Sequence, residues 1–205
     1  MKNTIIVLIS AFCVVFSLLG NAAEQPSTAI KILDRPLIPT GYGLTLMQSK
    51  DFYLGQLAID KSSVYRTPED LVFIDAARRM EFKFVNERKM SGKAFARKLA
   101  EGMKINNELE ALKDSSSTII RFKRFFKKAI KAGDVIRFDY HPDFGTRIYH
   151  NKRLLGEINN SREFYSFLMN IWLGDRPPSS TFKSGILGQN GDEYAVKLQQ
   201  RFNSL

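Results

Sequence analysis

Hydrophobic and polar residues alternate along several short segments of the chain. The clearest alternation covers residues 135–140, where Val, Arg and Asp at odd positions alternate with Ile, Phe and Tyr at even ones. A period of two is typical of a strand with one buried face. Two turn signals follow, at residues 141–145 and at Asn151 and Lys152, and each precedes another apolar segment. We therefore expect a three-stranded meander that ends near Ile158.

The first half of the chain contains further segments that predict strands. Residues 30–38 are interpreted as a strand or strand pair at an edge or bend, because Pro36 and Pro39 cannot donate to a hydrogen-bond ladder. Residues 41–44 (Gly-Tyr-Gly-Leu) predict a turn or bulge that leads into a strand. Residues 52–59 and 80–85 are expected to form two more strands.

Helix signals lie between these strands. Ser91 is a candidate N-cap for a helix on which Phe95, Leu99 and Met103 share one face. Helical periodicity continues over residues 106–131, with an expected break at 114–117. Asn160 and Glu163 have the spacing of a capping box for a later helix, although the same asparagine is also part of a glycosylation sequon. Other expected helices begin at Thr67 (ending near Ala76), at Phe182 (ending at Leu187) and at Gly191 (ending at Phe202).

The order of these elements indicates the fold class. Strands come first, then helices, then strands, then helices again. This order favours an α+β domain with helices on one face of a mainly antiparallel sheet. At 205 residues, with 44% hydrophobic residues, the chain is long enough for one domain with a substantial core.

The first 22 residues have the features of a secretory signal peptide. Lys2 precedes an apolar run over residues 5–19, and Gly20 and Ala22 suit a cleavage site. We expect cleavage after about Ala22 and an exported, periplasmic protein. An uncleaved anchor is the less favoured alternative, because a membrane span needs about 20 apolar residues. The single cysteine, Cys13, lies in this segment, so the mature chain would have no disulfide and no thiol chemistry.

Positive charge is concentrated in one segment. The chain has a formal net charge of +10 at pH 7. Residues 121–131 interleave basic and aromatic side chains, which predicts an amphipathic helix with solvated cations. An anionic membrane surface or anionic ligand is the alternative partner, whereas nucleic acid is not expected for an exported protein. The candidate contacts are Arg121, Lys123, Arg124, Lys127, Lys128 and Lys131.

The sequence offers little for metal or covalent chemistry. His141 and His150 flank a turn that also carries Asp139 and Asp143. Two imidazoles without a third ligand are weak evidence for a metal site, so we expect surface turn residues. The glycine pair in residues 41–43 lacks the third glycine of a dinucleotide site. We expect no cofactor, no metal and no catalytic triad.

Several motifs together resemble the bacterial chalcone-isomerase-like family. They are residues 133–136 (Gly-Asp-Val-Ile), 151–153 with Gly156, and 171–175 (Ile-Trp-Leu-Gly-Asp) with Pro178. Upstream, residues 41–44, Phe52, Tyr53 and Leu57 are similar to the family's glycine-rich strand pair, and residues 80–85 and 98–106 to its central strand and helix. The resemblance covers roughly residues 30–188. It implies an open-faced β-sandwich, a large antiparallel sheet covered by helices with a cleft between them.

The resemblance divides the chain into three parts. Residues 1–22 are the signal peptide and 23–188 form the chalcone-isomerase-like domain. Residues 189–205 are a polar C-terminal tail that we expect to be partly helical.

The same resemblance identifies candidate site residues. Plant members of the family cyclise chalcones with the help of an arginine, a tyrosine and a lysine, and other members bind fatty acids without catalysis. The arginine position falls at Thr45, the tyrosine at Phe95, and the lysine is kept as Lys98. An asparagine position falls at Gly102 and a threonine position at Ile171. Four of the five positions are therefore replaced, and neither a guanidinium nor a phenol remains at its place.

These replacements favour a non-catalytic protein. We expect it to bind a hydrophobic small molecule, such as a fatty acid, in the helix–sheet cleft, with Lys98, Phe95, Thr45 and Tyr53 as ligand contacts. One alternative is an isomerase or intramolecular lyase with a rebuilt active site around Lys98. A second alternative is a periplasmic protein that docks on an anionic membrane surface through residues 121–131.

Overall fold

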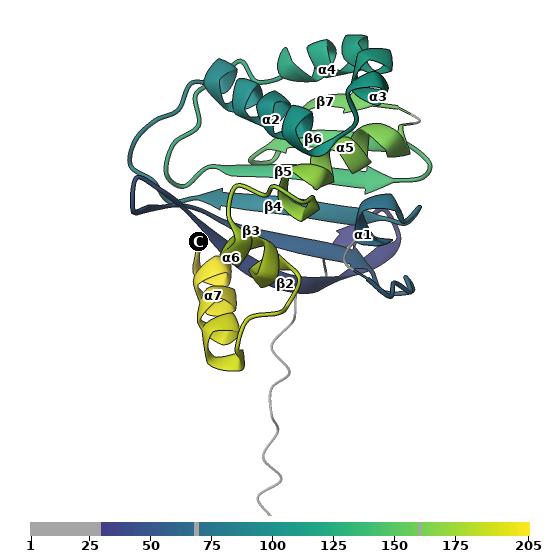
Figure 1. Ribbon diagram of the computed structural model, residues 1–205. Helices are drawn as coiled ribbons and strands as arrows, with labels where there is room; N and C mark the ends of the chain where they lie inside the picture. Colours follow the sequence, from purple (N-terminus) through teal and green to yellow (C-terminus); the bar gives the residue numbers. More distant parts are fainter. Residues whose placement is uncertain (1–29, 68–69, 160) are drawn as a thin grey trace, which may run out of the picture.

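The computed structural model describes residues 30–67, 70–159 and 161–205. Their strands form one seven-stranded antiparallel sheet in which each strand pairs with its neighbours in the chain (Figure 1). This arrangement confirms the expected α+β class and the large antiparallel sheet. The strands are β1 (Lys31–Ile32), β2 (Arg35–Met47), β3 (Lys50–Asp60), β4 (Arg78–Phe84), β5 (Val135–His141), β6 (Gly145–His150) and β7 (Arg153–Ile158).

Helices cover one face of this sheet. Helices α2 and α5 pack against each other and, with α1 and α4, lie over that face (Figure 1). Helix α6 lies on β2 and β3. The helices are α1 (Asp70–Phe73), α2 (Gly92–Asn106), α3 (Leu109–Asp114), α4 (Ser116–Lys123), α5 (Arg162–Leu173), α6 (Ser180–Ile186) and α7 (Asp192–Ser204).

The alternation along the strands decides which side chains reach the core. In β4, residues 78, 80, 82 and 84 are buried and those between them are half-buried. Phe82 and Phe138 face the helices and contact Trp172 of α5, with ring centroids 4.7 Å and 6.3 Å away. This inner face and its helices form the main core.

The glycines of β2 and β3 allow α6 to pack directly on the sheet. A Cβ atom at Gly55 would lie 2.4 Å from the Phe182 ring, and one at Gly43 would lie 2.7 Å from the same ring. Side chains at these positions would therefore push α6 away. The predicted bulge is confirmed by a register shift between Pro39 and Gly41, but these residues belong to one continuous strand.

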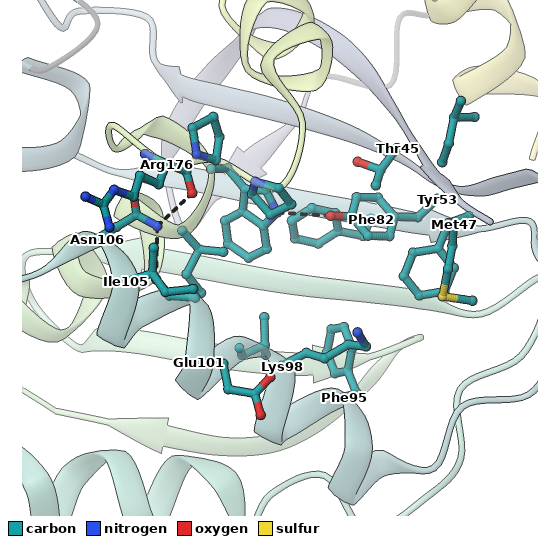
Figure 2. Close-up of a pocket in the computed structure, with 18 residues that line it drawn as sticks. Thr45, Met47, Tyr53, Phe82, Phe95, Lys98, Glu101, Ile105, Asn106 and Arg176 are labelled. Carbon is teal, nitrogen blue, oxygen red and sulfur yellow. Dashed lines mark hydrogen bonds between the residues drawn. The ribbon is translucent and has the colours of Figure 1, made fainter. Parts of the chain in front are cut away.

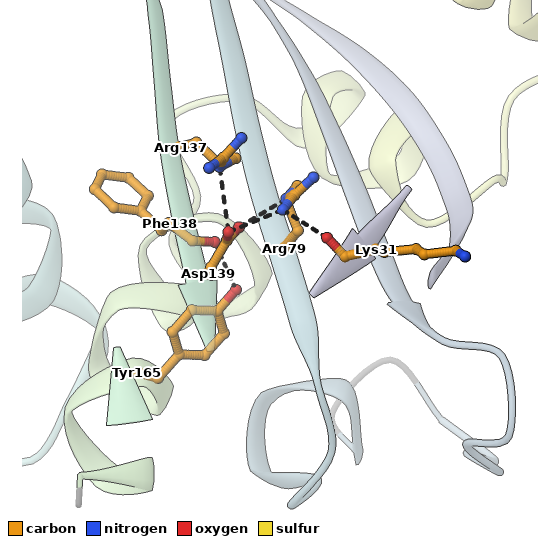
Figure 3. Close-up of polar contacts among 6 residues, drawn as sticks. All are labelled: Lys31, Arg79, Arg137, Phe138, Asp139 and Tyr165. Atoms are coloured by element: carbon orange, nitrogen blue, oxygen red, sulfur yellow. Dashed lines mark hydrogen bonds and ion pairs between the residues drawn. The ribbon is translucent and has the colours of Figure 1, made fainter. Parts of the chain in front are cut away.

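The outer face of the sheet carries charged side chains. Asp139 accepts two hydrogen bonds from Arg79, at 2.7 and 2.9 Å, and forms an ion pair with Arg137 at 3.2 Å (Figure 3). Arg79 also donates to the backbone oxygen of Lys31. The arginine guanidiniums join β4, β5 and the edge strand β1 on this face.

The C-terminal segment is an integral part of the fold. Helix α7 packs on the outer face, where Leu198 and Phe202 contact Tyr42 and Leu54. Lys83 of β4 donates to the backbone oxygen of Phe202 at 2.7 Å. The predicted polar tail is thus a helix with a buried apolar stripe. No helix among the described residues is long and apolar enough to cross a bilayer.

The structure corrects several local predictions. Ser161, not Asn160, caps α5, because its hydroxyl accepts a hydrogen bond from the backbone N–H of Phe164. Helix α1 ends at Phe73 rather than near Ala76. The signal peptide, Pro68 of the expected helix start and Asn160 of the sequon lie outside the described residues.

The largest correction concerns the basic segment. Helix α4 ends at Lys123, and residues 124–131 form turns and a bridge between Ile130 and Met90 instead of a helix. Phe126 and Ile130 still reach the core. The turns and the bridge to Met90 bury both side chains, so their helical spacing does not require a helix.

Candidate functional site

A pocket of about 470 Å³ lies between α2 and the inner face of the sheet. Figure 2 shows β-strand side chains on one side and α2 side chains on the other. We call it the ligand pocket. Its volume is in the range of small-molecule sites. The buried walls are formed by Thr45, Phe52, Tyr53, Phe82, Phe95, Leu99, Ile171 and Trp172.

Helix α2 presents one of its faces to this pocket. Ser91 caps the helix as predicted, because its hydroxyl accepts a hydrogen bond from Ala94 N–H at 3.2 Å. From this start, Phe95 and Leu99 are four residues apart and point the same way. Lys98 falls between them on the edge of that face and is exposed at the mouth.

Two hydroxyl groups lie in the otherwise apolar wall. Tyr53 Oη accepts a hydrogen bond from the Trp172 indole N–H at 3.1 Å (Figure 2). Burial raises the pKa of the Tyr53 hydroxyl, and the neighbouring Thr45 and Trp172 only partly offset this. Thr45 Oγ1 is buried and makes no hydrogen bond shorter than 3.5 Å with a described residue. The wall therefore offers neutral hydroxyls but no charge to a ligand.

Charged side chains are confined to the mouth of the pocket. Lys98 and Arg176 supply two cations there, and both are exposed. Glu101 also lies at the mouth and forms an ion pair with Arg97 at 3.6 Å. The pocket thus combines an apolar interior with a cationic entrance.

One end of the pocket is closed by a contact between α2 and the loop after α5. Asn106 Oδ1 accepts a hydrogen bond from Arg176 N–H at 2.8 Å, and Asn106 Nδ2 donates to the Arg176 carbonyl at 3.1 Å (Figure 2). The same Nδ2 donates to Gly102 at 3.1 Å. These bonds hold the loop that carries Pro177 and Pro178 against the pocket.

The structure brings the predicted ligand contacts together. Lys98, Phe95, Thr45 and Tyr53 all line this one pocket. The other two positions taken from the resemblance, Gly102 and Ile171, line it as well. Sequence reasoning missed Asn106, Arg176 and the partnership of Trp172 with Tyr53. The Trp-Leu-Gly-Asp motif was the available signal for the last of these.

The predicted membrane or anion contacts are gathered only in part. Arg121, Arg124, Lys127 and Lys128 line a second hollow, whereas Lys123 and Lys131 do not. The hollow also contains Arg153, which the sequence did not indicate. It has no acidic lining residue.

The histidines occupy different environments from those expected. His141 is buried rather than at the surface, stacks on Phe144 and accepts a hydrogen bond from Asp143 N–H through Nδ1 at 3.1 Å. His150 Nε2 lies 3.1 Å from Asp134. Within residues 30–67, 70–159 and 161–205, no three His, Cys, Asp or Glu side chains form a potential metal site.

The family model for chalcone isomerase-like proteins matches residues 27–188. The chain belongs to the chalcone isomerase-like family. A crystal structure of a fatty-acid binding protein from Arabidopsis thaliana has the same fold, with a TM-score of 0.59 and 16% sequence identity. The match covers 78% of this chain and 90% of the plant protein. No curated protein sequence matches this chain.

The family match includes every residue that lines the ligand pocket. The match ends at residue 188, just before α7, so the helix on the outer face lies beyond the matched part. The α2–sheet pocket lies entirely within it. The sequence-based recognition of the family is confirmed.

Proposed function

We propose that this protein binds a hydrophobic small molecule with an anionic end, such as a fatty acid, in the ligand pocket, and does not transform it. The observation that carries the proposal is the composition of the pocket. An apolar interior of about 470 Å³ opens at Lys98 and Arg176. The similarity in fold to a plant fatty-acid binding protein supports the same kind of ligand.

Electrostatics sets the expected orientation of the ligand. An ionised carboxylate in the buried wall would meet only neutral hydroxyls and would lose its hydration without a compensating charge. At the mouth, the same carboxylate can pair with Lys98 and remain partly hydrated. The acyl chain would then extend inward along Phe52, Phe82 and Trp172. Tyr53 and Thr45 would contact the chain or hold a water molecule.

The absence of catalysis is inferred from the replaced positions. Phe95, Gly102 and Ile171 bring no polar side-chain group to the pocket. The polar candidates in its lining are the Thr45 and Tyr53 hydroxyls, Lys98, and the mouth residues Glu101, Asn106 and Arg176. An enzyme with a rebuilt site would convert enone or chalcone-type substrates, and that turnover would disappear in Lys98→Ala.

The test begins with the purified protein. Native mass spectrometry and lipid extraction should recover a bound amphiphile, and a fluorescent fatty acid should displace it. Lys98→Ala should weaken fatty-acid binding about fivefold, the effect expected for one partly exposed charge contact of about 1 kcal/mol. Lys104→Ala, an exposed lysine on the same helix outside the ligand pocket, is the matched control. A protein that is empty after extraction and binds no fatty acid would contradict the proposal.

Export is a separate proposal. It rests on the apolar run and small residues of segment 1–22, together with the polar linker after it. The expected mature chain begins near Ala23. N-terminal sequencing of protein from the periplasmic fraction tests this, and an intact Met1 in the cytoplasmic fraction would contradict it.

A further inference from the structure

A second hollow, of about 480 Å³, lies between the segment that follows α4 and the hairpin of β6 and β7. We call it the basic surface. Its cations are Arg121, Arg124, Lys127, Lys128 and Arg153. Four of them come from residues 121–128 and the fifth from the start of β7, and the sequence alone does not predict that these segments lie side by side.

The positive charge of the basic surface is not neutralised locally. No Asp or Glu lines the hollow. Among the described residues, no ion pair within 4 Å joins any of its five cations to an acid. The chain from residue 115 to residue 133 has six basic residues and no acidic one. Such a concentration of charge attracts an anionic partner.

Apolar side chains line the same hollow as the five cations. Leu154 is 45% exposed at the start of β7, directly beside Arg153. Phe125 is half-buried over Gly156, where a Cβ atom would lie 2.4 Å from its ring. Exposed aliphatic and basic groups side by side are typical of surfaces that enter the headgroup region of a bilayer.

Hydrogen bonds hold the two segments in place. Met90 and Ile130 exchange backbone hydrogen bonds of 2.9 and 2.8 Å. Asp134 accepts hydrogen bonds from Lys131 N–H at 2.9 Å and from the Asn151 side chain at 3.1 Å. These contacts position the basic turn and the hairpin tip together, so little ordering is needed when a partner binds.

We propose that the basic surface docks the protein on an anionic lipid bilayer. Its arginines and lysines contact lipid phosphates, and Leu154 enters the boundary between headgroups and acyl chains. Nucleic acid fits less well, because Phe126 is buried and Phe125 is half-buried against Gly156, so the hollow offers little aromatic surface for base stacking. The inference is independent of the ligand pocket, since a protein without ligand would still bind vesicles.

Vesicle partitioning tests this docking. Full-length mature protein should sediment with phosphatidylcholine vesicles that contain phosphatidylglycerol, and not with pure phosphatidylcholine. Raising NaCl from about 0.1 M to about 1 M should release it, because the screening length falls from about 10 to about 3 Å. Each exposed cation near the surface contributes about fivefold, so Lys127→Ala/Lys128→Ala should lower partitioning about 30-fold.

Two further variants distinguish the effect of total charge from the effects of the local cations and of Leu154. Lys31→Ala/Lys61→Ala removes the same charge away from the basic surface, on the edge strand β1 and just after β3, and should leave partitioning nearly unchanged. Leu154→Gln keeps the charge and should lower partitioning about fivefold. All of these side chains are exposed, so the fold should be retained.

Three results would overturn the inference. They are equal binding to neutral vesicles, unchanged partitioning of Lys127→Ala/Lys128→Ala, and tighter binding to a DNA oligonucleotide than to anionic vesicles at the same salt concentration. The last result would assign the basic surface to nucleic acid.

Discussion

Tyr53 accepts a hydrogen bond from the Trp172 indole N–H at 3.1 Å in the buried wall of the ligand pocket. The bond connects β3 to α5 across the core, between two residues 119 positions apart in the chain. It fixes the ring of Tyr53 at the place where a ligand would contact the sheet. Tyr53 and Trp172 therefore both line the ligand pocket and stabilise its wall.

Removing the Tyr53 hydroxyl should destabilise the protein. In Tyr53→Phe the buried indole N–H of Trp172 loses its partner, which costs about 1–3 kcal/mol of unfolding free energy. Urea denaturation followed by tryptophan fluorescence measures this directly. Tyr194→Phe, an exposed tyrosine on α7, is the control and should change stability by less than about 0.5 kcal/mol. Equal stability of the two variants would show that Trp172 finds another acceptor.

The charge at the pocket mouth should decide affinity for an anionic ligand. Ile105 lines the mouth and is 55% exposed, so a polar residue there should not disturb the fold. We expect Ile105→Glu to weaken fatty-acid binding and Ile105→Lys to strengthen it, each by about threefold to fivefold. Titration of a fluorescent fatty acid at low salt measures both. Identical effects of the two variants would mean that the ligand's polar end does not lie at this mouth.

Asp139 should be important for the stability of the outer face. Its side chain is 5% exposed and pairs with Arg79, whose side chain is 12% exposed. Burial would lower the pKa of Arg79, but hydrogen bonds to Asp139 outweigh this and raise it. Asp139→Asn leaves Arg79 and Arg137 without a carboxylate and should cost about 3 kcal/mol.

A matched exposed pair provides the comparison for Asp139. Glu193 and Lys197 form a surface ion pair on α7 at 2.6 Å. Glu193→Gln should cost no more than about 0.5 kcal/mol, because water screens this pair. If thermal melting shows similar losses for both variants, the Asp139 network is not a major source of stability.

The contribution of Asp134 should depend on pH. Burial would raise its pKa, but hydrogen bonds from Asn151 and Lys131 N–H, together with the neighbouring His150, lower it below the ordinary 3.8. A lowered carboxyl pKa stabilises the fold above the unfolded-state value and loses this effect as pH falls through the folded-state value. Asp134→Asn should therefore cost about 1–2 kcal/mol at pH 7, and the difference should shrink below about pH 4. Urea denaturation over pH 2–7 checks this, and a constant difference would contradict it.

Alternation predicted the strands well because one face of each strand packs against helices. The pattern of residues 135–140 could be converted directly into inward and outward side chains of β5. Arg78 lies just outside the predicted strand 80–85, yet it occupies an inward position of β4 and is fully buried. Its guanidinium donates to the carbonyls of Leu71 and Val72 and lies over the rings of Tyr140 and Tyr165. No alternation pattern indicates that an arginine will be held by carbonyls of α1 and by tyrosine rings of β5 and α5.

The pocket contacts came from the resemblance rather than from periodicity. Phe95 and Lys98 were placed on one helix, but the strand that faces them could not be derived from spacing. The contact between Asn106 and Arg176 was missed because the Asn106 side chain binds backbone groups of a residue 70 positions later in the chain. Residues 124–131 were predicted as part of an amphipathic helix in which Phe122, Phe125, Phe126 and Ile130 pack on the sheet. In the structure, the turns after α4 and the bridge to Met90 bury Phe126 and Ile130 without a helix.

The strictly sequential order of the strands has a consequence for how the chain folds. Within β1–β4 and within β5–β7, consecutive strands are joined by comparatively short connections. The pairing of β4 with β5, which we call the seam, joins segments separated by residues 85–134. Among the strand pairings, the one that closes this long loop is the least local. Until the seam forms, β4 and β5 each have one unpaired edge and an apolar inner face. At high concentration these edges can pair with another molecule, so exchange of halves between two chains is the expected route of misassembly.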